Sequence, residues 1–487
     1  MAAPPPSQAT GPWTLLEQRV LQPSSGIRGD GAAAWSLLDL TAPIRAQVFL
    51  HMVGDLLRYS GANEVNIQLD ILRSVCRELR EQVDEECLTF NYDDTCGMIA
   101  GTGNEKEEIR LLSSCIKRHP RLRYFECLLR STAKFHALLE ALELPAGTRC
   151  SFAFEFKVSA EEALRLFRRF RVRRLSFIPQ EEGPDRRLGD WSSLPETNLH
   201  TVCLRSCTDH VVRSFMMASP RLQGLQVMDS RLLGEVGVNF GNLSSLSLTG
   251  ITMPDEQFTR LIAGCQNLRS LYIAKCHVSN ITVALPRLEL LSVTHCRQLT
   301  DDCASEMLNP AHNPSLRFID LTEDRSLVSP TVAHPRLQIA WLMHCPQLTD
   351  HAVSHMFNNC PGLTAANLVQ SMIESALICS PALRTLELTT SQRLTDTAVT
   401  QLMQHCPNLS FLDVGHCCQL VEPVFSHRVL ETILLSFCVQ LRESAIVGLF
   451  ANCPSLRYVE LAVCMFDMTR FQRECNPQCQ VVVNFDF

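Results

Sequence analysis

The chain has 487 residues, of which 46% are hydrophobic and 20% charged, a composition compatible with a packed core. Its formal net charge of −7 at pH 7 removes the overall positive charge on which binding to nucleic acids or anionic membranes usually depends. The first residues resemble no secretory signal, and no stretch reaches the roughly 18 apolar residues of a membrane-spanning helix. We therefore expect a cytoplasmic or nuclear protein with reduced cysteines, and no nucleic-acid or membrane partner.

The N-terminal part predicts two segments. Residues 1–34 are rich in Ala, Pro, Ser and Gly, which favours a flexible arm. Over residues 35–87 the apolar residues recur at helical spacing, so we expect a small all-helical module there. Its two apolar stripes consist of Leu40, Ile44, Val48 and Met52, then Leu72, Val75, Leu79 and Val83.

From about residue 88 the apolar residues recur as triplets at positions i, i+3 and i+5. Twelve triplets begin at Leu199, Leu222, Leu243, Leu268, Leu288, Leu316, Leu337, Leu363, Leu383, Leu409, Leu430 and Leu456. Weaker triplets begin at Leu122, Arg149 and Val172, and a final strand is expected at Val481 to Val483. This is the strand pattern of a leucine-rich repeat, so residues 88–487 are expected to form an α/β solenoid. The expected shape is a curved horseshoe with parallel strands inside and helices and extended segments outside.

The repeats alternate in length, with successive starting leucines 20 to 28 residues apart. Long units contain segments with helical apolar spacing that open with Thr-Asp or Glu-Ser and close with a Cys that Pro follows. These segments are 348–360, 394–406 and 441–453. Short units have too few residues for a full helix and are expected to cross the outer side in extended form.

Cysteines recur at fixed positions of the repeat. Position i+8 holds Cys207, Cys276, Cys296, Cys345, Cys417, Cys438 and Cys464, and position i−3 holds Cys265, Cys360, Cys406 and Cys453. This pattern resembles the cysteine-containing subclass of leucine-rich repeats, in which the thiol stands at the strand exit. The alternative is metal binding by the His-Cys pairs at 295–296, 344–345 and 416–418. Because those pairs lie about a repeat or more apart, we expect no metal, no cofactor and no disulfide.

Six arginines lie in the segment 164–174, LRLFRRFRVRR. Leu164, Phe167 and Val172 can face the core, so we expect the arginines on a solvated convex surface; an acidic partner or a nuclear-import signal is the alternative. Histidines and carboxylates follow the repeat period instead of clustering, and no catalytic motif is present, so we expect no enzyme.

The N-terminal helices resemble an F-box, a module that binds the Skp1 adaptor, although Thr41, Pro43 and Arg45 depart from its usual pattern. The resemblance rests on the segment 40–52, LTAPIRAQVFLHM, and on the Val-Cys-Arg-x-Leu core at 75–79. It implies adaptor contacts through Leu40, Ile44, Val48, Phe49, Met52, Leu72, Val75, Cys76 and Leu79. The chain as a whole is therefore similar to the F-box and leucine-rich-repeat family.

That family implies the substrate-recognition subunit of a Skp1-cullin-F-box ubiquitin ligase. The helical module would bind Skp1, and through it a cullin, while the concave face of the repeats would hold an unknown protein substrate. The alternative is a non-enzymatic scaffold, for an axonemal or signalling assembly, with a degenerate F-box-like cap.

The strand pattern also predicts the concave face. Since i+3 and i+5 point into the core, i+2, i+4 and often i+6 point outward. The predicted partner-binding residues are Tyr272, Phe318, Asp320, Ile339, Trp341, Met343, Glu387, Phe411, Asp413, Leu434, Tyr458 and Glu460, with Leu290 also exposed by the same rule. Trp341 is the expected anchor, and the acidic residues favour a partner with Lys or Arg. The alternative is that the C-terminal tail or packing between strands covers these side chains.

Overall fold

The computed structural model describes most of the repeat region. The described residues are 89–93, 105–117, 122–178, 191, 194–231, 240–375, 377–462 and 479–482, all within one unit of the chain, Gly61–Phe487. The predicted arm over 1–34 and the predicted helical module over 35–87 lie outside them. The boundaries of these segments, including the start of the solenoid near residue 88, stay predictions.

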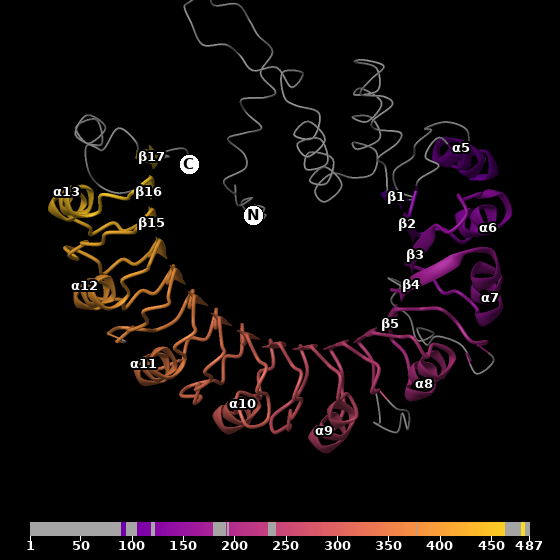
Figure 1. Ribbon diagram of the computed structural model, residues 1–487, viewed down its shortest axis with the longest axis horizontal. Coiled ribbons are helices and arrows are strands. Elements are labelled where there is room, and N and C mark those ends of the chain that lie inside the picture. The colour runs from indigo at the N-terminus through magenta and orange to yellow at the C-terminus, as the bar shows by residue number, and fades with distance from the viewer. Residues whose placement is uncertain are drawn as a thin grey trace, which may run out of the picture. The chain divides into compact units, whose positions relative to one another are not determined.

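Seventeen strands of the described residues form one sheet, and each strand pairs in parallel with the next along the chain. Figure 1 shows these strands side by side along the inner side of a curved solenoid. The strands are β1 (Thr89–Asp93), β2 (Tyr124–Leu129), β3 (Arg149–Phe154), β4 (Arg171–Phe177), β5 (Thr201–Arg205), β6 (Gly224–Met228), β7 (Ser245–Thr249), β8 (Ser270–Ala274), β9 (Leu290–Thr294), β10 (Phe318–Asp320), β11 (Ile339–Trp341), β12 (Ala365–Asn367), β13 (Thr385–Glu387), β14 (Phe411–Asp413), β15 (Thr432–Leu434), β16 (Tyr458–Glu460) and β17 (Gln480–Val482). The predicted leucine-rich-repeat solenoid is confirmed.

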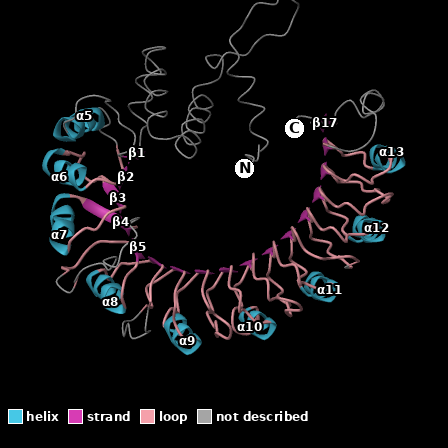
Figure 2. Ribbon diagram, turned by 180° about the vertical axis from the view of Figure 1, so that it is seen from behind, coloured by secondary structure: helices cyan, strands magenta, loops and turns pink. Residues whose placement is uncertain are grey.

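Helices lie on the outer side of the solenoid (Figure 2). They are α5 (Glu105–Lys117), α6 (Thr132–Ala141), α7 (Ala160–Arg169), α8 (Asp209–Ala218), α9 (Asp255–Ala263), α10 (Asp301–Met307), α11 (Asp350–Asn359), α12 (Asp396–His405) and α13 (Glu443–Asn452). The three helices predicted in long units are thus confirmed as α11, α12 and α13. None of the helices in the described part of the chain is long and apolar enough to cross a membrane.

From β5 to β16 the strands pair in an unshifted register, in which each i+3 residue lies opposite the i+3 residue of the next unit. One earlier prediction is wrong in detail, because Cys127 and not Phe125 pairs with Phe152. The triplet assigned from Leu122 is therefore displaced by two residues. A displacement of two keeps every side chain on the predicted face of the sheet, so the sequence pattern alone could not reveal it.

A left-handed residue ends the strand in each described unit from Leu199 to Leu430. Position i+7 has positive φ at Ser206, Asp229, Gly250, Lys275, His295, Glu323, His344, Gln370, Thr390, His416 and Phe437. This turn directs the i+8 side chain into the core, where the thiols of Cys345 and Cys438 donate to the carbonyls of Leu321 and Val414 of the preceding unit, at 3.2 Å each. The cysteine column therefore satisfies carbonyl groups between repeats.

An aspartate at the first residue of several outer helices connects neighbouring units. In α10 the two carboxylate oxygens of Asp301 accept from the backbone N–H groups of Val328 and Ser329, at 2.9 and 2.8 Å. Asp255, Asp350 and Asp396 make the equivalent contacts from α9, α11 and α12. These bonds satisfy backbone donors of the helix-poor unit that follows, which explains how long and short units can alternate.

Asp301→Ala is expected to lower the free energy of unfolding by about 1–3 kcal/mol, because it leaves two backbone donors without their charged acceptor. The measurement is urea denaturation followed by circular dichroism. Asp302→Ala is the matched control, since the neighbouring Asp302 is exposed. Equal effects of the two substitutions would contradict the role assigned to Asp301.

Asp324 occupies position i+8 of its unit, where neighbouring units have Cys296 and Cys345. Its side chain is 0% exposed. One carboxyl oxygen accepts from the backbone N–H of Cys296 at 2.5 Å, and the other oxygen has no partner among the described residues. Burial, and in addition the charge of Asp320, raises the pKa of Asp324 to about 8. At neutral pH the folded chain therefore holds this carboxyl protonated.

The raised pKa of Asp324 predicts a pH dependence of stability. Between its ordinary value of 3.8 and about 8, the folded state binds a proton that the unfolded state has released. The contribution of Asp324 to the free energy of unfolding therefore decreases as the pH rises through this window, by at most about 1.4 kcal/mol per pH unit. Urea denaturation at several pH values should show that Asp324→Asn removes this decrease. An unchanged slope in the variant would contradict the protonated state.

Candidate protein-binding face

Along each strand, every second side chain points to the inner face of the sheet and the others point into the core. In β8 Leu271 and Ile273 are 0% exposed, whereas Tyr272 between them is 37% exposed. Every predicted face residue is likewise exposed or partly exposed, so the predicted orientation is confirmed for all of them. That a partner binds them stays a prediction.

An apolar patch lies on the inner face from β8 to β11. Leu290, Phe318 and Ile339 are direct neighbours on three consecutive strands. Trp341 is 40% exposed, and its ring packs edge to face against that of Phe318, with centroids 4.9 Å apart. We call Tyr272, Leu290, Phe318, Ile339 and Trp341 the inner apolar patch. Packing between strands covers Trp341 only in part, which leaves its ring accessible to a partner.

The other predicted apolar residues do not join this patch. Ala365 and Thr385 lie between Ile339 and Phe411 in the same row of the sheet, so Phe411 is separated from the patch by two strands with small side chains. Phe411, Leu434 and Tyr458 form a second group on β14 to β16, and Met343 lies beyond the end of β11. The alternative that the C-terminal tail covers these side chains stays untested, because most of that tail lies outside the described part of the chain.

An acidic row crosses the same face at position i+4. It consists of Asp320, Glu387, Asp413 and Glu460 on β10, β13, β14 and β16. Glu387 lies directly opposite Asp413, whereas Trp341, Asn367 and Leu434 occupy the same position on the strands between the others. Burial, and then the charge of Asp413, raises the pKa of Glu387. Burial also raises the pKa of Asp413, with a further contribution from Glu460, although Thr389 and the N–H of Gly415 oppose the shift through hydrogen bonds. Paired carboxylates of this kind favour a cationic group on the ligand.

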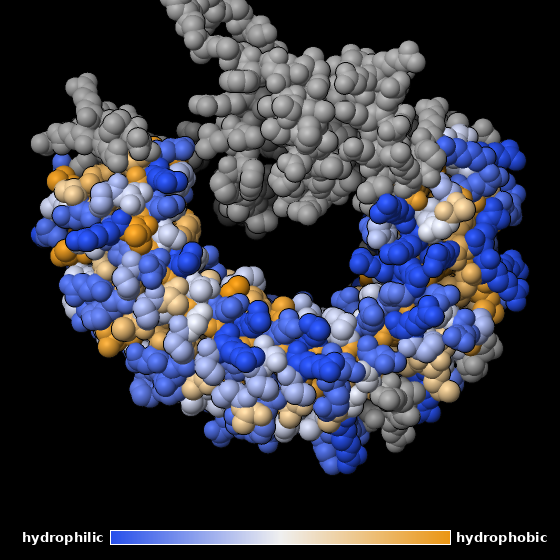
Figure 3. Space-filling model, in the orientation of Figure 1, coloured by the Kyte–Doolittle hydropathy of each residue, from blue (hydrophilic) through white to orange (hydrophobic). Residues whose placement is uncertain are grey.

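The arginine-rich segment 164–174 divides between two surfaces, which partly corrects the prediction of a convex surface. Arg165, Arg168 and Arg169 belong to the outer helix α7, as expected. Arg171 and Arg174 belong to β4, where they are exposed on the inner face. Figure 3 shows strongly hydrophilic residues gathered on the arm of the solenoid that carries β2 to β5. Helix α7 ends at Arg169, and the sequence pattern did not reveal that the arginine-rich segment continues into strand β4.

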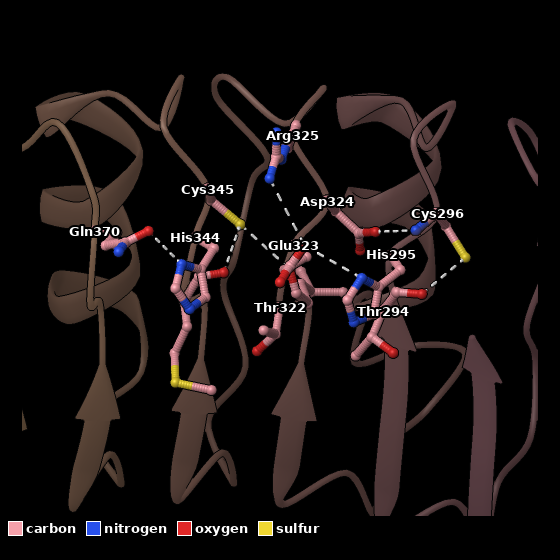
Figure 4. A network of polar contacts seen from close by, with 12 residues as sticks. Thr294, His295, Cys296, Thr322, Glu323, Asp324, Arg325, His344, Cys345 and Gln370 are labelled. Atoms are coloured by element: carbon pink, nitrogen blue, oxygen red, sulfur yellow. Dashed lines mark hydrogen bonds and ion pairs between the residues drawn. The ribbon is translucent and has the colours of Figure 1, made fainter. Parts of the chain in front are cut away.

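The His-Cys pairs at 295–296 and 344–345 each point their two side chains in different directions (Figure 4). Cys296 and Cys345 are 0% exposed, whereas the side chain of His295 is 41% exposed and lies 3.2 Å from the Glu323 carboxylate. Burial raises the pKa of Cys345 to about 12, which keeps its thiol protonated. In the described part of the chain, no three His, Cys, Asp or Glu side chains are placed to hold a metal ion.

The predicted adaptor-binding residues, from Leu40 to Leu79, all lie outside the described residues. Asp324 was missed by sequence reasoning, although an aspartate in the cysteine column was a visible signal. Arg171 and Arg174 were assigned to the wrong surface.

Comparisons with known proteins concern mainly the repeats. The sequence profile described as "FBD-associated F-box protein At5g56370, LRR repeats" matches residues 164–324. Comparison with curated protein sequences gave no match. Similar chains occur in the yeast Rad7 and Elc1 complex (14% identity, 98% of each chain covered, TM-score 0.34) and in the mouse RP105/MD-1 complex (14% identity, 72% of each chain, TM-score 0.42). Another occurs in the TLR13-ssRNA13 complex, with 16% identity, 72% of this chain and 44% of that chain covered, and a TM-score of 0.38.

At these identities and TM-scores the solved structures carry no argument about function. The profile match, in contrast, falls on the repeats that the sequence and the solenoid define independently, from α7 to the exit of β10. Over this third of the chain, the repeats are similar to the leucine-rich repeats of an F-box protein family.

Proposed function

We propose that this chain is the substrate-recognition subunit of a Skp1-cullin-F-box ubiquitin ligase. The observation that carries the proposal is the match of residues 164–324 to the repeats of an F-box protein family. In the proposal, the N-terminal helices bind Skp1 and the inner face of the solenoid holds a protein substrate in the cytoplasm or nucleus.

The receptor itself makes and breaks no bonds in this proposal. Its contribution is proximity, because holding an acceptor lysine near a charged conjugating enzyme makes the transfer effectively intramolecular. The inner apolar patch supports the substrate half of the proposal, since a group of large apolar side chains around an exposed Trp341 has the composition of a binding hot spot. The acidic row supports a substrate segment that presents Lys or Arg beside an apolar anchor.

The adaptor half is tested by co-purification of the full chain with Skp1. We expect binding by the unmodified chain and loss of at least about tenfold with Val48→Asp or Phe49→Asp, because a charge would be buried in an apolar contact. Glu105→Gln, in the outer helix α5, is the control. Absence of Skp1 from the unmodified chain would defeat the ligase proposal and favour the scaffold alternative.

The substrate half is tested by Trp341→Ala. Because Trp341 is partly exposed and packs edge to face against Phe318, the substitution should lower the free energy of unfolding by only about 1 kcal/mol. Quantitative co-purification should show loss of bound partner proteins, whereas Met217→Ala, at a position 71% exposed on α8, retains them. A loss of stability of about 3–5 kcal/mol, as for a buried aromatic residue, would show instead that Trp341 is a core residue.

A further inference from the structure

Two aromatic rings and a carboxylate lie together on the inner face at β10 and β11. The rings of Phe318 and Trp341, which we call the aromatic pair, stand nearly perpendicular, with an interplanar angle of 78° and centroids 4.9 Å apart. Asp320 lies directly opposite Trp341 on the neighbouring strand and follows Phe318 by two residues on its own strand. Side chains two residues apart in a strand point to the same face, so a ligand on this face meets the carboxylate and both rings.

The faces of the aromatic pair suit a cation. The π-system of an aromatic ring is negative on its faces, and a cation within about 6 Å of the ring centroid is attracted to it. Trp341 is exposed and Phe318 is partly exposed, which leaves ring surface for a ligand. Arginine guanidinium groups lie over the rings of Tyr124 and Phe170, but among the described residues none lies over the aromatic pair. The π-faces of the pair are therefore available to a cation from outside the chain.

The Asp320 carboxylate is held in place but is not neutralised. Its Oδ2 accepts from the Ser292 hydroxyl and its Oδ1 from the backbone N–H of Thr322, at 3.1 Å each. The nearby Glu323 pairs with His295 at 3.2 Å, whereas Asp320 has no ion pair among the described residues. A negative charge fixed beside the aromatic pair adds to the attraction that a cation experiences there.

Apolar side chains border the aromatic pair on both sides. Leu290 on β9 and Ile339 on β11 lie directly opposite Phe318, and both are partly exposed. The long carbon stem of a lysine side chain packs well against such surfaces while its charged end extends beyond them. The surroundings of the pair therefore fit a cation that is carried on an aliphatic chain.

The chemistry favours a methylated ammonium group over an unmodified one. An unmodified lysine ends in a compact, strongly hydrated ammonium group with three donors, and ring faces are poor substitutes for the water that it would lose. Methyl groups remove the donors and surround the charge with apolar surface, which ring faces contact directly. Asp320 balances such a charge without having to accept a hydrogen bond from it. An arginine fork, in contrast, needs paired acceptors, and each oxygen of Asp320 already accepts one bond.

We propose that the aromatic pair and Asp320 bind a methylated lysine side chain of a partner protein. The choice of a protein as the source of the methylated ammonium group rests on the proposed function. In this arrangement the charged group lies against Trp341 beside Asp320, and the lysine stem lies against Leu290 or Ile339. Methylation of the substrate would then decide whether the inner face holds it.

The test measures retention of the full-length chain on immobilised peptide pools that differ only in a fixed central residue. That residue is trimethyllysine, lysine or the tert-butyl analogue of trimethyllysine, which has the same shape without the charge. We expect retention on the trimethyllysine pool at least about fivefold above that on each of the other pools, as for a partly exposed cation–π contact.

Substitutions of Trp341 test the role of the ring. Trp341→Leu should abolish the excess retention on the trimethyllysine pool, while Trp341→Phe should keep part of it because a smaller ring face remains. The matched control is Tyr124→Leu, which removes an exposed aromatic side chain on β2 whose ring already carries the Arg149 guanidinium at 5.7 Å. This control should retain the full excess.

Asp320→Asn tests the role of the charge. It should lower the excess at least about twofold, because the substitution removes the charge and keeps the shape of the side chain. Its control is Asp302→Asn, which makes the same change of net charge at an exposed residue of the outer helix α10. Equal losses in the two variants would contradict the proposal and show attraction by overall charge alone.

The peptide pools also define the results that would overturn the proposal. Equal retention on the trimethyllysine and tert-butyl pools would show a purely apolar contact, and stronger retention on the lysine pool would show an ordinary ion pair with Asp320. Free choline that displaces the chain as effectively as a trimethyllysine peptide would show a small-molecule site instead. Thermal unfolding of each variant confirms that it is folded, and Trp341→Phe keeps the test decisive if Trp341→Leu does not fold.

Skp1 co-purification separates this proposal from the ligase proposal. The Trp341→Leu variant should still bind Skp1, since its substitution lies in the repeats. If the unmodified chain fails to bind Skp1 but discriminates trimethyllysine, the ligase proposal falls and the methylated-lysine site stands. If it binds Skp1 without that discrimination, the methylated-lysine site alone falls.

Discussion

The unshifted register of the parallel strands is the constraint on which the rest of this structure depends. Val202 in β5 and Val459 in β16 occupy the same position of the ladder. The same positions therefore point inward or outward in every unit between them. The left-handed residue at i+7 then turns the chain at the same point of each unit. Rows of like positions follow directly, and they create both the cysteine column in the core and the acidic row on the inner face.

The repetitive part of this architecture could be predicted from the sequence, because burial of leucines at i+3 and i+5 follows a strict period. The exposure of Trp341 beside Phe318 followed from the same rule. The displaced triplet at Leu122 could not be recognised, since a shift of two residues preserves the inward pattern. The protonated state of Asp324 depends on burial that composition does not report, and the inner position of Arg171 depends on where α7 ends.

Three kinds of chemistry share the inner face of the solenoid. Arg149, Arg171 and Arg174 on β3 and β4 are cationic, the patch at β8 to β11 is apolar, and β10, β13, β14 and β16 each carry an acidic residue at position i+4. Adjacent strands lie about 4.8 Å apart, so the seven strand intervals from β4 to β11 span roughly 34 Å, the reach of about ten extended residues. A single extended segment of a partner could therefore contact the cationic and apolar regions together, which gives more selectivity than either region alone.

The central claim is that partners bind the inner face and not the outer helices. Hydroxyl-radical footprinting of the full chain, free and bound to a co-purified partner, measures this most directly. The account predicts that binding protects Trp341 and Phe318 from oxidation while Met217 on α8 stays reactive. Protection confined to the outer helices, with Trp341 as reactive as in the free chain, would contradict it.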